Sequence, residues 1–69
     1  MALREQLERL VDEMVTRGIR YPDAQREFEK RFMARALSHA KGNIGDAAAL
    51  MGVHRNTLSR KMSEYRLRR

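Results

Sequence analysis

The sequence contains no cysteine, which removes two ways of stabilising a short chain. Neither a disulfide nor a thiolate metal site can hold the 69 residues together. The only histidines, His39 and His54, fall on different predicted helices, so we expect no zinc or other metal site and no cofactor. A domain of this length buries little apolar surface by itself. Stability therefore has to come from close helix packing or from association of chains.

Proline, glycine and aromatic residues are also scarce, with one proline, four glycines and 6% aromatic residues. Together with 35% charged residues, this composition is typical of a helical protein and not of a β-sandwich. No apolar run approaches the roughly 18 residues that a membrane span needs, and there is no signal-peptide core. We therefore expect a soluble, cytoplasmic protein without a membrane partner.

The sequence also lacks the usual parts of an enzyme site. It has no glycine-rich phosphate loop, and His54 and Ser59 are five residues apart on a predicted helix, a poor geometry for a nucleophile and its base. We predict that the chain is not an enzyme and that it has no small-molecule ligand.

The apolar pattern predicts an all-α fold that begins with two amphipathic helices. Leucine and methionine residues at a four-three-four spacing favour a helix over residues 3–17, which Gly18 ends. A second helix is expected over residues 22–41, because Pro22 suits a first helical turn and Gly42 is the expected C-cap.

Two shorter helices are predicted to follow, over residues 44–51 and 55–65. Gly52 separates them, since glycine readily adopts the positive φ that ends one helix and redirects the chain. Ala48 lies four residues before this glycine and is small enough for two helices to cross closely, and Leu58 lies six residues after it as an apolar anchor. This combination is typical of a helix-turn-helix motif.

Basic charge is concentrated in the same half of the chain. Of the net charge of +6, residues 1–36 contribute +1 and residues 37–69 contribute +5. Polyanions bind such a surface by releasing condensed counterions. Charge and motif together predict binding to double-stranded DNA. The candidate contacts on the last helix and its start are His54, Arg55, Asn56, Thr57, Ser59, Arg60 and Lys61.

The C-terminal part of the chain resembles the DNA-binding end of the Fis family, which includes the C-terminal domains of NtrC-type activators. The matching positions, over the last third to half of the chain, are Gly42, Asn43, Ala47, Ala48, Met51, Gly52, Val53, Arg55, Thr57, Leu58, Lys61 and Tyr65. The resemblance implies a bacterial homodimer, either a transcriptional regulator or a nucleoid-associated protein, that bends DNA to meet both recognition helices. Fis also has an N-terminal arm that engages recombinases. This chain begins directly with a helix, so we expect no role in DNA inversion.

Arg55 is the strongest candidate for reading a base, since a guanidinium can donate two parallel hydrogen bonds to guanine N7 and O6. The resemblance implies the same contact for Arg55, and backbone contacts for Thr57 and Arg60. His54 stands where Fis has an asparagine that faces the bases, and an imidazole cannot reproduce a bidentate amide, so its role stays open. Asn43 can cap its helix, contact a phosphate as the resemblance implies, or do both.

Several other positions differ from Fis or add to its pattern. Asn56 replaces a glycine and can add an outward polar group, while Ser59 replaces an arginine and weakens one phosphate contact. Lys61 is expected to supply flanking charge. Gly45 and Asp46 stand where Fis has threonine and arginine. The carboxylate of Asp46 would repel phosphate if it faced the DNA, but it also suits a helix N-terminus.

We expect residues 1–41 to dimerise and residues 42–69 to form the DNA-binding segment of a single Fis-like domain. The first two helices carry more leucine, methionine and phenylalanine than one hairpin can hide, so two hairpins could pack into a four-helix core. Two-fold symmetry would also match two recognition helices to two half-sites. The alternative is a monomer in which the hairpin folds over its own helix-turn-helix. The candidate dimer contacts are Leu3, Leu7, Leu10, Met14, Phe28 and Phe32.

Two other interpretations stay open. The chain can be the excised C-terminal domain of a larger NtrC-type activator. It can also be a helical dimerisation module that binds a protein partner and never meets DNA, for which Asp46 and Ser59 give some support. The main interpretation is a homodimeric, all-α, Fis-like DNA-binding protein, located in the cytoplasm with the nucleoid.

Overall fold

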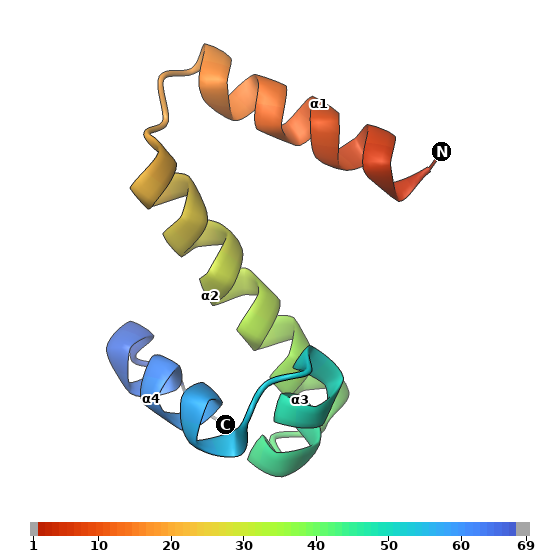
Figure 1. The fold of residues 1–69 in the computed structure, drawn as a ribbon, viewed down its shortest axis with the longest axis vertical. Coiled ribbons are helices and arrows are strands. Elements are labelled where there is room, and N and C mark those ends of the chain that lie inside the picture. Colours follow the sequence, from red (N-terminus) through yellow and green to blue (C-terminus); the bar gives the residue numbers. More distant parts are fainter. Residues whose placement is uncertain (1, 68–69) are drawn as a thin grey trace.

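The computed structural model describes residues 2–67, so the outer ends of the predicted segments 1–41 and 42–69 lie outside the described residues. The described residues form four helices and no strand (Figure 1). The all-α prediction is therefore confirmed. None of these helices is long and apolar enough to cross a lipid bilayer. The helices are α1 (Leu3–Thr16), α2 (Tyr21–His39), α3 (Ile44–Met51) and α4 (Arg55–Tyr65).

The end of α2 differs from the prediction. The helix ends at His39 with Ala40 as its C-cap, so the prediction of Gly42 as the cap is wrong. Lys41 already takes a positive φ of 54°, and Gly42 follows at 83°. The N–H of Gly42 then donates to the carbonyl of Leu37 at 2.9 Å. This hydrogen bond gives a carbonyl of the last helical turn its partner, and the chain leaves the helix there toward α3. The helix therefore ends two residues before its predicted end.

The core lies where α3 and α4 pack against the C-terminal half of α2 (Figure 1). The small side chain of Ala48 lets α3 approach closely, and Leu58 anchors α4, as the sequence predicts; Ala47 is buried beside Ala48. The buried cluster is Met33, Ala36, Leu37, Ala47, Ala48, Leu58 and Met62. Because three of these residues belong to α2, the helix-turn-helix depends on α2 for its core.

Helix α1 stands apart from this core. It contains no buried residue, and from the end of α2 that lies far from α3 and α4 it turns back and diverges from α2 (Figure 1). Met14 is half buried, whereas Leu7 and Leu10 are exposed. Helix α1 therefore does not fold over the helix-turn-helix, and its apolar stripe is left largely uncovered by the described part of the chain.

Candidate nucleic-acid interface

A left-handed glycine sets the turn between α3 and α4. Gly52 ends α3 with a φ of 71°, a backbone conformation that would be strained for a residue with a side chain. The N–H of Val53 donates a hydrogen bond to the carbonyl of Ala48 at 3.0 Å, which closes the last turn of α3. Helix α4 then begins at Arg55, and Arg55 and Asn56 are exposed.

His54 is the N-cap of α4. Its Nδ1 accepts a hydrogen bond from the backbone N–H of Asn56 at 3.0 Å. A ring nitrogen that accepts a hydrogen bond carries no proton, so the other nitrogen, Nε2, holds the N–H in the neutral ring. Nδ1 of the imidazole is therefore used by the cap, and the N–H at Nε2 can still donate to a partner. The sequence pattern indicates His54 only as a DNA contact and not as a cap.

One face of α4 is locked to the core and the opposite face is polar. Leu58 and Met62 are buried on the inner side. Residues four apart on a helix lie on the same face, so the outer side chains form two adjacent rows. Arg55 with Ser59 and Asn56 with Arg60 make up these rows, and all four residues are exposed; Thr57 and Lys61 are half buried at the edges.

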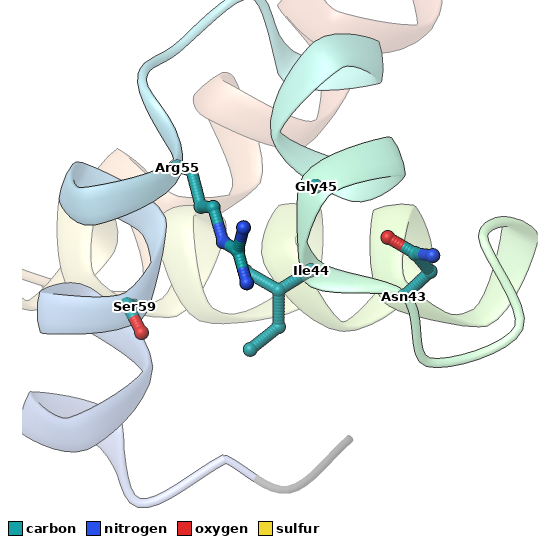
Figure 2. A pocket seen from close by; sticks show the side chains of 5 residues that line it. All are labelled: Asn43, Ile44, Gly45, Arg55 and Ser59. Carbon is teal, nitrogen blue, oxygen red and sulfur yellow. The ribbon is translucent and has the colours of Figure 1, made fainter.

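A shallow cleft of about 430 Å³ lies between this polar face and the start of α3. Its walls are Arg55 and Ser59 from α4 and Asn43, Ile44 and Gly45 from α3. Figure 2 shows the guanidinium of Arg55 extending from α4 across the cleft toward Ile44. The predicted contacts Asn43, Arg55 and Ser59 therefore come together at one place, although they lie on two helices.

The start of α3 is capped as predicted. The side-chain oxygen of Asn43 accepts a hydrogen bond from the backbone N–H of Asp46 at 3.0 Å. A Cβ at Gly45 would lie 3.3 Å from that oxygen, so a larger residue would crowd the cap. Asp46 lines a separate hollow with His39 and Lys41 and not the cleft of Arg55. The carboxylate of Asp46 therefore lies outside the cationic cleft.

Lys61 takes part in a contact that joins α4 to α2. Its Nζ donates to Oε2 of Glu29 at 3.1 Å, and the hydroxyl of Tyr65 donates to Oε1 of the same carboxylate at 2.6 Å. The hydrogen bond from Tyr65, followed by the one from Lys61, lowers the pKa of Glu29 below its ordinary value. The same carboxylate raises the pKa of Tyr65. We call these three residues the Glu29 cluster.

The sequence reasoning missed Glu29 and the contact made by Tyr65. A signal for Glu29 was present, because it precedes Met33 and Leu37 by four and eight residues on the core-facing side of α2. A carboxylate in such an apolar row needs a partner. The partners lie 32 and 36 residues further along the chain, so a local pattern could not identify them.

These features define a helix-turn-helix protein: a short helix, a left-handed glycine turn, and a second helix with an anchored inner face and a polar outer face. The family model described as bacterial regulatory protein, Fis family, matches residues 24–65, which is more than half of the chain. The chain belongs to the Fis family of DNA-binding transcription regulators, as its resemblance implied.

Similar proteins fall into two groups. A Fis-like DNA-binding protein of Xylella fastidiosa (strain Temecula1) is 48% identical over 42 residues, which cover 61% of this chain and 47% of that protein. The DNA-binding transcriptional regulators NtrC of Klebsiella pneumoniae and Escherichia coli K12 are each 45% identical over 42 residues, covering 61% of this chain and 9% of those proteins. The chain thus spans about half the length of the first relative. No solved structure matches the chain.

Proposed function

We propose that the chain binds double-stranded DNA as a homodimer with a preference for certain sequences, and that each subunit places α4 in the major groove. The observation that carries the proposal is the polar outer face of α4, held against the core through Leu58 and Met62. This face lies in the half of the chain that carries a balance of +5. An anchored cationic helix fits a groove that can admit one α-helix.

Arg55 is proposed to read a guanine. It stands at the first residue of α4, the end of a recognition helix that meets base edges. Asn56 is exposed beside it and offers an amide to a neighbouring base. His54 can add one hydrogen bond from Nε2, because Nδ1 serves the helix start.

Phosphate contacts are proposed on both sides of the cleft. Asn43 uses its oxygen for the cap, which leaves its NH₂ group to donate to a phosphate. Thr57 offers a hydroxyl, Arg60 offers a charge, and Ser59 offers a weaker hydroxyl contact from the wall of the cleft. Lys61 contributes less free charge than Arg60, because its ammonium is already shared with Glu29.

Homodimerisation is proposed from the apolar surface of α1 and α2. A hollow of about 850 Å³ lies between them, lined by Leu10, Met14, Phe28 and Phe32 among others. Phe28 is 56% exposed, although the two phenylalanine rings already contact each other with centroids 5.5 Å apart. Monomeric proteins rarely leave so large an apolar surface open.

A second copy is the occupant that fits this surface best. The surface includes one whole face of α1, with Leu3 and Leu7, so a partner has to supply an apolar helical face of similar length. A second copy supplies that face by two-fold symmetry and would complete a four-helix core. The pair would also carry two copies of α4, and DNA bending on the nucleoid would follow if these stand closer than one helical turn.

Replacing Arg55 with alanine tests the DNA-binding part. We expect Arg55→Ala to lose preference among duplex sequences, because the guanine contact disappears. The matched control is Arg9→Ala, which removes the same charge from an exposed position on α1. Binding is measured by fluorescence anisotropy on labelled duplexes at several salt concentrations. Unchanged affinity and unchanged sequence preference for Arg55→Ala would argue against the proposal.

A second candidate keeps the site but places it in a larger protein. The 45% identity to NtrC regulators, of which the matched residues form only 9%, favours this possibility. In that case DNA binding would serve a transcription activator with further domains. The mass of the native protein in its source cell separates the two candidates.

A further inference from the structure

Helix α4 is tied to α2 by polar contacts as well as by the core. Within residues 2–67, the side-chain hydrogen bonds that join two different helices are those from Tyr65 and Lys61 to Glu29. Both oxygens of the carboxylate are used, one by each donor. The Lys61 and Glu29 side chains are 30% and 29% exposed, so the contact is partly shielded from water.

The Glu29 cluster lies where it can fix the angle between α4 and α2. The buried cluster takes Met33, Ala36 and Leu37 from the C-terminal half of α2, and Leu58 and Met62 from α4. Glu29 lies one turn nearer the start of α2, and Tyr65 is the last residue of α4. Leu58 and Met62 hold α4 on the core by apolar packing. The hydrogen bonds from Lys61 and Tyr65 are directional, so they add a constraint on the angle of α4 near its far end.

Glu29 also lies next to the surface proposed for dimerisation. Phe28, its neighbour in the chain, lines the apolar hollow between α1 and α2. Successive residues on a helix point about 100° apart, so α2 carries the dimer contact on one face and the α4 contact on the adjacent face. A change in the angle between α2 and α4 would therefore change the separation of the two α4 helices in the dimer.

We propose that Glu29 is a positioning residue that holds α4 at a fixed angle to α2 and thereby selects the spacing between the two half-sites of the DNA target. This inference rests on the proposed function, since it requires a homodimer that binds DNA. Charge-assisted hydrogen bonds suit this role, because they are short and directional. The carboxylate of Glu29 is ionised at neutral pH, the form that accepts both bonds, and the same two bonds lower its pKa further.

The test measures binding to duplexes in which two half-sites are separated by different numbers of base pairs. We expect the wild-type chain to favour its best spacing over neighbouring spacings by about tenfold, the size of one mismatched base pair. Glu29→Ala should reduce that preference to about threefold or less while a single half-site is bound as before. Glu29→Gln keeps an acceptor for Tyr65 and should restore part of the preference.

Two further variants separate positioning from stability. Leu37→Val disturbs the buried cluster without touching Glu29, so it should lower the unfolding temperature and keep the spacing preference. Tyr65→Phe retains the ring and removes one hydrogen bond, so it should broaden the preference even if Glu29→Ala folds poorly.

The outcomes distinguish the two proposals. If Glu29→Ala and Tyr65→Phe keep the wild-type spacing profile, or if Leu37→Val broadens it equally, the positioning role is refuted while the proposed function stands. If the wild-type chain binds none of the duplexes, the proposed function and the positioning role are both refuted.

Discussion

The imidazole Nδ1 of His54 accepts a hydrogen bond from the backbone N–H of Asn56 at 3.0 Å, and this bond caps the start of the helix that carries Arg55. The first turn of a helix has N–H groups without partners, so a cap here supports the part of α4 that is proposed to meet bases. His54, which was expected to face DNA, therefore also caps the helix on which Arg55 and Asn56 lie.

Removing this cap should weaken the fold. We expect His54→Ala to lower the free energy of unfolding by about 1 kcal/mol, the usual effect of losing an N-cap. His54→Asn should lose much less, because asparagine caps helices well. Urea denaturation followed by circular dichroism gives both values. Equal stability of the alanine variant and the wild type would show that the imidazole does not act as a cap.

The stability of the chain should depend on pH through Glu29 and Tyr65. The folded-state pKa of Glu29 is lowered, so its contribution is present above the unfolded pKa and is lost as pH falls through the folded one. The folded-state pKa of Tyr65 is raised, so its contribution is present below the unfolded pKa and is lost as pH rises through the folded one. The bond between them is therefore strongest between these limits.

Tyr65→Phe makes this dependence measurable. The unfolding temperature of the variant should fall furthest below that of the wild type between about pH 5 and pH 9, where the carboxyl is ionised and the phenol is protonated. The difference should shrink toward both extremes of pH. Thermal scans across the range provide the measurement, and a difference that is independent of pH would exclude this source of stability.

Salt dependence should separate Arg60 from Lys61. If Arg60 neutralises a phosphate, Arg60→Met should make the slope of log K against log salt shallower by about 0.9 for each phosphate that is no longer neutralised. Lys61→Met should change the slope less, since its ammonium is paired with Glu29 at 3.1 Å. Both variants remove one positive charge from α4, so each serves as the control for the other. Equal slopes would mean that the ammonium of Lys61 leaves Glu29 for the DNA or that both residues lie outside the interface.

A charge on the apolar surface should separate the subunits. Phe28 is exposed in a single chain, so Phe28→Lys should leave the helical content nearly unchanged. In a dimer the same lysine would be buried without a partner, which is costly. We expect sedimentation equilibrium to give single chains for Phe28→Lys and dimers for the control Gln25→Lys, which adds the same charge at an exposed site on α2. Dimers of Phe28→Lys would place the interface elsewhere.

Local signals in the sequence were enough for most of the fold. Gly52 ends α3 and Gly18 follows the C-cap of α1, both with positive φ, and Asn43 caps the start of α3. Each of these residues has a strong conformational preference. The end of α2 was misplaced because Lys41 takes a left-handed conformation that lysine rarely adopts. The cap at His54 was missed because histidine is not among the residues that favour N-caps.

The site was predictable to a lesser extent. The spacing of residues on α4 correctly indicated an outer polar face, because helical periodicity places Asn56 and Arg60 opposite Leu58. The cleft that unites Arg55 with Asn43, and the link from Glu29 to Tyr65, depend on how separate helices pack. Contacts between residues far apart in the chain leave no period in the sequence.

The most direct test of a paired helix-turn-helix that reads DNA is selection from a library of random duplexes. We predict enrichment of a two-fold symmetric sequence with a guanine in each half-site, and loss of selection at that guanine for Arg55→Ala. Selection of no sequence at all, or of a single unpaired site by a chain that sediments as a monomer, would contradict this prediction.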